Sequence, residues 1–122
     1  GAAKSHLRDF AGVPYNGART DKYTWEQTLN DVTITVPVPA GTKARDVVCV
    51  ISKGHLRVGL KGGEPVIDAD FPLDDRNGQQ VWEKVRADES YWNLGKASGE
   101  GEVVTVYLEK EREAWWKSAV AG

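Results

Sequence analysis

The segment 46–60, DVVCVISKGHLRVGL, decides the fold class of this chain. Its first half, DVVCVIS (46–52), is an almost continuous β-branched run, and its second half, HLRVGL (55–60), alternates apolar and polar residues. β-Branched runs favour strands, and alternation indicates one buried face and one solvated face. Only Lys53 and Gly54 separate the two halves. The pattern therefore predicts a two-residue β-hairpin in which Gly54 supplies a positive φ.

The period of two continues on both sides of this hairpin. In VTITVPVP (32–39) the aliphatic residues share one face and the threonines the other, while Pro37 and Pro39 place the end of the strand at a sheet edge. Further strand candidates are PVIDADFPL (65–73), QVWEKVRA (80–87), SYWNLG (90–95) and EVVTVYLEKE (102–111). Short segments at this spacing predict an all-β antiparallel sandwich or barrel.

Both ends of the chain differ from this pattern. Residues 1–22 show neither a helical nor a strand period, and we expect an extended arm that lies on the domain through Phe10 and Tyr15. The chain opens on GAA without an initiator Met, which is typical of a cloning scar and of a domain taken from a longer protein. We assign residues 23–112 to the β-domain and expect a short helical tail over 113–122, within REAWWKSAV and the residues after it.

Composition excludes several classes of protein. The 122 residues suffice for one domain, and 16 basic against 18 acidic residues give a net charge of −2, without the basic excess of a nucleic-acid or membrane binder. The opening GAAKSHL lacks the apolar centre of a signal peptide. A single cysteine excludes an internal disulfide and a Cys-rich zinc site. We expect a cytoplasmic protein, with nuclear or cytoskeletal association as alternatives.

No residue pattern predicts catalysis, a metal or a cofactor. The glycines of GHLRVGLKGGEP (54–65) precede Glu64 and a strand, whereas a phosphate-binding loop requires Lys-Ser/Thr and a helix. In the predicted hairpin Cys49 lies opposite Val58 rather than His55, so the thiol has no base. The acids Asp68, Asp70, Asp74 and Asp75 do not fit a calcium loop and are typical of solvated turns. We therefore expect a non-enzyme.

Charge and tryptophan content are the informative anomalies. Residues 42–62 hold five bases and one acid, and residues 63–78 hold five acids and one base. Two interpretations stay open: cross-strand pairing of opposite charges, or a bipolar surface that selects a protein partner. The chain also holds five tryptophans beside two phenylalanines. Trp25 is expected in the core, and exposed members of the set would serve as interface anchors.

The order of several motifs resembles the CS domain of the NudC (nuclear distribution protein C) family. The most specific pieces are Tyr23-x-Trp25-x-Gln27, the run HLRVGLKG (55–62), and Leu108-Glu109-Lys110 ahead of Trp115-Trp116. The resemblance covers about residues 23–120. It implies an antiparallel β-sandwich of the HSP20-like chaperone type, for which we expect seven to eight strands. The loops DDRNGQQ (74–80) and KASGEG (96–101) are longer than the family pattern leads us to expect.

The resemblance implies a non-catalytic chaperone or co-chaperone. Expected partners are client proteins, including WD-repeat proteins of the dynein pathway, and the 90-kDa heat-shock chaperone, with roles in nuclear migration and cell division. The isolated domain is expected to be monomeric, and the full-length protein to dimerise through a coiled coil outside this chain. Candidate partner-binding residues are His55, Arg57, Lys61, Glu64, Trp92, Trp115 and Trp116. The alternative for the tryptophans is a place in the core or a staple for the tail. The alternative function is a carbohydrate- or small-ligand-binding β-sandwich that uses exposed tryptophans.

Overall fold

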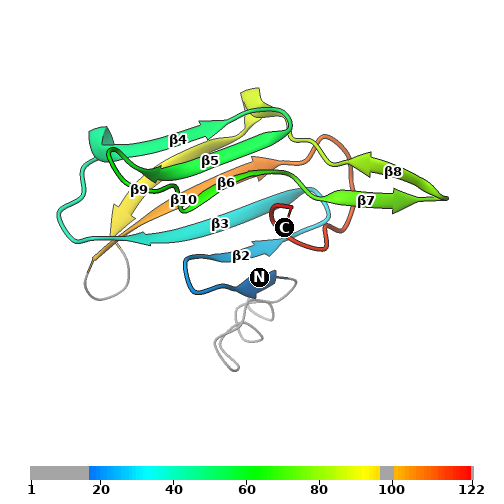
Figure 1. Ribbon diagram of the computed structural model, residues 1–122. Helices are drawn as coiled ribbons and strands as arrows, with labels where there is room; N and C mark the ends of the chain where they lie inside the picture. Colours follow the sequence, from blue (N-terminus) through cyan, green and yellow to red (C-terminus); the bar gives the residue numbers. More distant parts are fainter. Residues whose placement is uncertain (1–16, 97–100, 122) are drawn as a thin grey trace.

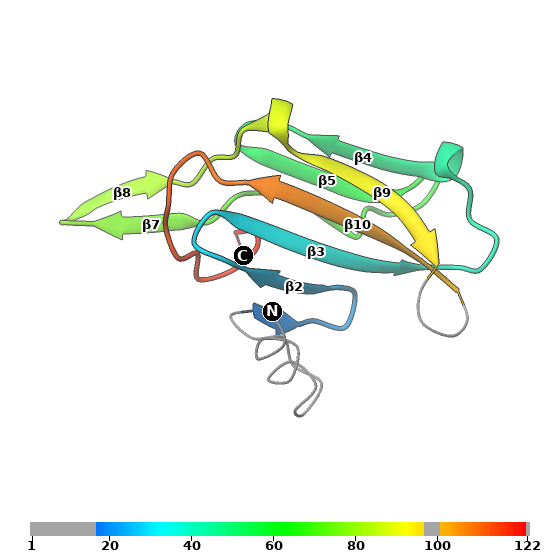
Figure 2. The same ribbon diagram turned by 180° about the vertical axis from the view of Figure 1, so that it is seen from behind.

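The computed structural model describes residues 17–96 and 101–121, and these form two facing antiparallel β-sheets (Figures 1 and 2). The larger sheet has the strand order β1-β2-β3-β10-β9 and the smaller one the order β4-β5-β6. Strands β7 and β8 pair separately, as a hairpin that projects from one end of the sandwich. The predicted all-β antiparallel sandwich is confirmed. It has ten strands in the described residues, because Gly17–Arg19 and the projecting hairpin add to the expected set.

The strands follow the sequence closely. In the larger sheet they are β1 (Gly17–Arg19), β2 (Thr24–Gln27), β3 (Asp31–Val38), β9 (Tyr91–Lys96) and β10 (Glu102–Glu109). In the smaller sheet they are β4 (Val47–Ile51), β5 (His55–Leu60) and β6 (Ile67–Asp70), and the separate hairpin comprises β7 (Leu73–Arg76) and β8 (Gln79–Trp82). Short 3₁₀ turns at Ala44–Asp46 and Ala87–Glu89 precede β4 and β9.

The hydrophobic core lies between the two sheets and obeys the predicted alternation. On β3 and β10 every second residue is almost completely buried, namely Val32, Ile34, Val36, Val104, Val106 and Leu108. The smaller sheet contributes Leu56, Val58 and Ile67, and Phe71 and Trp25 complete this layer. Gly59 is needed for close packing, because a Cβ there would lie 3.0 Å from the Pro65 Cα. The inward and outward faces that the sequence predicted are therefore correct.

The hairpin 46–60 has the predicted register but not the predicted turn. Ile51 pairs with Leu56 and Cys49 with Val58, across the two-residue connection Lys53-Gly54. Gly54, however, is not in the left-handed region, so our expectation of a positive φ there is wrong. Left-handed residues instead close the β7–β8 hairpin, where Asn77 has φ 53° and Gly78 φ 82°. This Asn-Gly pair converts the long segment DDRNGQQ into a hairpin.

Two predictions for the ends of the chain need correction, and one for a sheet edge is confirmed. The extended arm predicted over residues 1–22 does not reach residue 22, because Gly17–Arg19 forms a strand of the larger sheet paired with β2; Phe10 and Tyr15 lie outside the described residues. The proline end of VTITVPVP lies at a sheet edge as predicted, because pairing with β2 ends at Thr35 and leaves this end bonded only to β10. The predicted C-terminal helix is wrong, because residues 113–121 contain no helical turn.

The tail is not helical because its amide groups bond to other parts of the chain. The N–H groups of Glu111, Ala114 and Ala121 donate to the carbonyls of Lys84, Leu29 and Asp70, respectively. In a helix over these residues the Ala121 N–H would instead donate to the carbonyl of Lys117, four residues earlier. The tail thus crosses the end of the sandwich in an extended, bent path beside β2 and β7 (Figure 1).

Candidate functional site

His55 joins β5 to β6 through two carboxylates. Its Nδ1 lies 2.7 Å from Oδ1 of Asp70, and its Nε2 lies 2.7 Å from Oδ1 of Asp68. A carboxylate only accepts hydrogen bonds, so both ring nitrogens act as donors when the imidazole is protonated. The hydrogen bond to Asp70, followed by that to Asp68, raises the pKa of His55. The ring is thus a cross-strand clamp on the solvent face.

We predict that removing this clamp lowers the pKa of His55. In the double variant Asp68→Asn, Asp70→Asn, the histidine pKa should fall toward its ordinary value near 6.5, because neither amide stabilises the cation as a carboxylate does. NMR titration of the ring protons measures this shift. Asp75→Asn, an exposed acid on β7, is the control and should leave the His55 pKa unchanged.

The clamp also fixes the sign of a pH dependence. Since the folded-state pKa is raised, the wild-type clamp contributes its full stability below about pH 6.5 and loses it as the pH rises through the folded pKa. A difference between wild type and double variant that grows with rising pH would contradict this assignment.

The other candidates from the sequence separate into different environments. Arg57 lies beside His55 on the exposed face of β5, opposite Asp68 in register. Lys61 and Glu64 are exposed in the turn that follows. The contacts of His55 on β5 with Asp68 and Asp70 on β6 favour cross-strand pairing of the sorted charges.

The tryptophans divide between core and surface. Trp25 is buried as predicted, and Trp92 is partly buried against the core. Trp116 is only 3% exposed and stacks on Phe71 with ring centroids 5.4 Å apart. It cannot present a surface anchor, so the alternative of a staple for the tail describes it. Trp115 and Trp82 are each at least half exposed.

Three of the residues that carry the family resemblance, Gln27, Lys110 and Trp116, form one buried network. Gln27 on β2 donates from Nε2 to the carbonyl of Trp116 at 2.7 Å, and its Oε1 accepts from the Trp116 N–H at 2.9 Å. Lys110 Nζ donates to the same Oε1 at 2.8 Å, and to the carbonyls of Thr28 and Ala114. Burial lowers the pKa of Lys110 to about 8. These motif residues therefore fasten the tail to β2.

A second buried charge fastens the projecting hairpin. Glu83, directly after β8, is 3% exposed and accepts from Arg76 Nη2 at 2.9 Å. Its other oxygen lies 3.7 Å from Nε of Arg112 in the tail. The Glu83 carboxylate thus links Arg76 on β7 to Arg112 at the start of the tail, and this link holds the hairpin and the tail together.

The outer face of the larger sheet is a surface that sequence reasoning missed. Thr24, Thr35, Thr105 and Asn93 form one cross-strand row, and Thr33, Tyr107 and Tyr91 form the next. The rings of Tyr91 and Tyr107 lie 4.8 Å apart, and Tyr91 is 56% exposed. We call these seven residues the threonine–tyrosine face. The alternate threonines of β3 and β10 were its signal in the sequence, but they become neighbours only through strand pairing.

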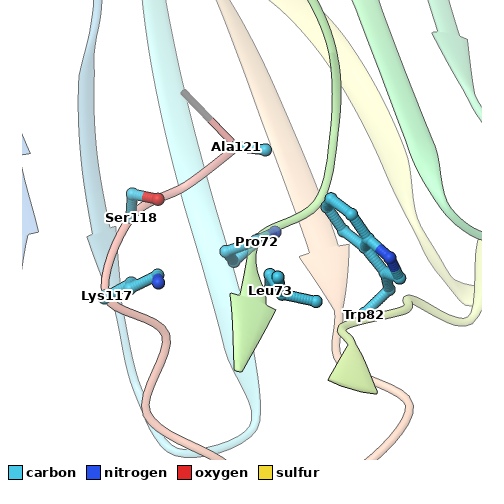
Figure 3. Close-up of a pocket in the computed structure, with 6 residues that line it drawn as sticks. All are labelled: Pro72, Leu73, Trp82, Lys117, Ser118 and Ala121. Atoms are coloured by element: carbon cyan, nitrogen blue, oxygen red, sulfur yellow. The ribbon is translucent and has the colours of Figure 1, made fainter. Parts of the chain in front are cut away.

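A pocket lies between the projecting hairpin and the tail. It has a volume of about 410 Å³ and is lined by Pro72, Leu73, Trp82, Lys117, Ser118 and Ala121 (Figure 3). The sequence did not predict it, because the two walls come from segments about 40 residues apart that only the tertiary structure brings together.

The described residues contain no arrangement that suggests catalysis. Burial raises the pKa of the Cys49 thiol to about 11, so it is not activated as a nucleophile. No group of three or more His, Cys, Asp or Glu residues in this part of the chain could hold a metal ion. None of the helices in the same ranges has the length and apolarity needed to cross a membrane.

Comparison with known proteins decides the family. A family model described as the CS domain matches residues 21–110. This chain belongs to the CS domain family. Solved structures agree: the CS domain of human KIAA1068 protein superposes with a TM-score of 0.66 at 28% identity, over 88% of this chain and 79% of that one. The nuclear movement protein from E. cuniculi gives 0.59 at 28% identity, over 81% and 98%.

The relatives of this CS domain are NudC-like proteins. Protein BOBBER 1 of Arabidopsis thaliana is 39% identical over 108 residues, which are 88% of this chain and 31% of that protein. The nuclear migration protein nudC of Drosophila melanogaster is 33% identical over 120 residues, or 96% and 32%. The chain thus spans about a third of the length of these relatives. CS domains of this kind are non-catalytic interaction modules, and the predicted resemblance and the non-enzyme assignment are confirmed.

Proposed function

We propose that this CS domain is a co-chaperone module that binds and stabilises client proteins without ATP. Its clients include WD-repeat proteins of the dynein pathway, and its second partner is the 90-kDa heat-shock chaperone. Through them the protein acts in nuclear migration and cell division, in the cytoplasm. Membership of the CS domain family and the names of the relatives, which include nuclear migration and nuclear movement proteins, support this proposal.

The observation that carries the proposal is the threonine–tyrosine face. Its two central rows are built on paired strands of the larger sheet and present hydroxyl, amide and phenol groups, with one charged side chain, Glu26 on β2, at the end of the tyrosine row. Its Tyr91 ring is more than half exposed. Aromatic rings are typical anchors of protein interfaces, and a rigid sheet adds little ordering cost on binding. Hydroxyl groups around the rings can bond to exposed backbone of a partly unfolded client.

The test is suppression of client aggregation. We expect the wild-type domain at an equimolar ratio to suppress heat-induced light scattering of citrate synthase in the absence of ATP. Tyr91→Asp should remove most of this suppression, because it removes the exposed aromatic ring and places a charge that binding must desolvate. Val50→Asp is the matched control, since Val50 is 52% exposed on β4 of the opposite sheet.

The partners need a separate measurement. Pull-down with the full-length protein should recover a WD-repeat protein and the 90-kDa chaperone, and Tyr91→Asp should lose them. A variant with His55, Arg57 and Lys61 all changed to Glu tests the β5 surface in the same experiment. Failure of the wild-type domain both to suppress aggregation and to recover these partners would overturn the proposed function.

A further inference from the structure

The pocket between the hairpin and the tail has an apolar floor and one aromatic wall. Pro72 is fully buried beneath it, and Leu73 pairs in register with Trp82 across the β7–β8 ladder. The Trp82 ring stands beside Pro72 and Leu73, and Lys117 and Ser118 lie on the opposite side (Figure 3). At about 410 Å³ the pocket lies within the range of roughly 300–1,000 Å³ that is usual for ligand sites.

Both walls of the pocket are anchored to the rest of the domain. The hairpin wall is held by the Glu83 N–H, which donates to the Pro72 carbonyl at 2.8 Å. The tail wall is held by the Ala121 N–H, which donates to the Asp70 carbonyl at 2.8 Å, while Ser118 Oγ donates within the tail to the Val120 carbonyl at 2.6 Å. Since the pocket is already formed, ordering its walls on ligand binding costs little free energy.

The charged residue that lines the pocket is basic. Lys117 is exposed and forms no ion pair or hydrogen bond with any residue that the structure describes. No acidic side chain lines the pocket. Asp70, whose carbonyl accepts the Ala121 N–H, has its carboxylate bonded to His55. An ammonium without a partner beside an apolar cavity complements a ligand that combines an apolar group with a carboxylate.

We propose that this pocket docks a partner polypeptide through a bulky apolar side chain flanked by an acidic residue. The apolar side chain packs on Pro72 and Leu73 against the ring of Trp82, and the carboxylate pairs with Lys117. The inference rests on the proposed function, since it names a second contact of the same protein-binding module, on a different part of the surface from the threonine–tyrosine face.

The test is NMR titration of the labelled domain with three matched peptides. They are acetyl-Ser-Gly-Asp-Leu-Phe-Glu-Gly-Ser-amide, a version with Lys and Arg in place of Asp and Glu, and a version with Ala-Ala in place of Leu-Phe. We expect only the first to shift the indole N–H signal of Trp82 and the amide signals of residues 117–121. Trp82→Ala should weaken its binding by about 30-fold, as for a hot-spot tryptophan.

Charge reversal makes the test specific. Lys117→Glu should weaken the affinity for the acidic peptide by roughly tenfold, because like charges repel at the rim, and should allow the basic peptide to bind. Trp115→Ala and Lys61→Glu are matched controls, since both residues are exposed and neither lines the pocket. Equal binding of acidic and basic peptides, unchanged affinity in Lys117→Glu, or a Trp82 shift produced by cellohexaose instead of the peptide would each overturn the proposal.

The aggregation assay separates this proposal from the proposed function. If peptide binding fails while the wild-type domain still suppresses aggregation, the pocket proposal is wrong and the co-chaperone function stands. If the acidic peptide binds as expected but no client is protected and no partner is recovered, the pocket proposal stands and the co-chaperone function is wrong.

Discussion

Lys110→Met is expected to lower the free energy of unfolding by about 2–4 kcal/mol. The ammonium donates to Gln27 Oε1 and to the carbonyls of Thr28 and Ala114, and the lysine is 3% exposed. Each acceptor left buried without a donor costs about 1–3 kcal/mol. Part of this loss is offset, because burial that lowers the pKa of Lys110 from 10.5 to about 8 is a penalty of roughly 3 kcal/mol that methionine avoids.

Urea denaturation at pH 7, followed by tryptophan fluorescence, measures this effect. Lys61→Met is the matched control, because Lys61 is exposed in a turn, and it should change stability by less than about 0.5 kcal/mol. Gln27→Ala tests the network, since Gln27 bonds to both Lys110 and the Trp116 backbone. The two substitutions should be strongly non-additive in a double-mutant cycle. A Lys110→Met variant as stable as wild type would show that the network does not fasten the tail.

Phe71→Ala is expected to lower the free energy of unfolding by about 3–5 kcal/mol. The Phe71 side chain has no exposed surface and its ring packs on Trp116. Its position between β6 and β7 places it where the smaller sheet, the hairpin and the tail meet. Truncation leaves a cavity that rigidly paired strands cannot close, so the lost contacts are not recovered.

The same denaturation series measures this second effect. Trp82→Ala removes a larger aromatic ring, but one that is 50% exposed, and it should cost less than about 1 kcal/mol. A similar cost for both variants would contradict the place of Phe71 in the core. The denaturation curve of Trp82→Ala also shows whether this variant, which the peptide titration uses, is folded.

The strands could be predicted from the sequence because apolar and polar residues alternate along them. The alternation in β3 and β10 identified the buried residues, and the short connection between β4 and β5 set the register of their hairpin. The predicted exposure of His55 was also correct, but its partners were not foreseen. Asp68 and Asp70 bond to it only because β6 pairs beside β5.

The tail shows where local pattern fails. Its buried residues Trp116, Ala119 and Val120 have the i, i+3, i+4 spacing of one face of a helix, which is the structure we predicted. The tail is extended because its backbone bonds to β2 and β6 instead. The two tryptophans looked equivalent in the sequence, yet one is buried and its neighbour is exposed. The path of the backbone through the tail decides which of the two side chains points into the core.

By itself, the sequence determined the all-β class, the faces of the principal strands and the resemblance to the CS domain, because each depends on neighbouring residues or on their order. The tertiary structure decided the path of the tail, the role of the motif residues and the two candidate binding surfaces. Gln27 and Trp116, which hold the tail, are 89 residues apart in the chain. A periodic pattern of neighbouring residues carries no information about a hydrogen bond between residues so far apart, so only the folded chain reveals it.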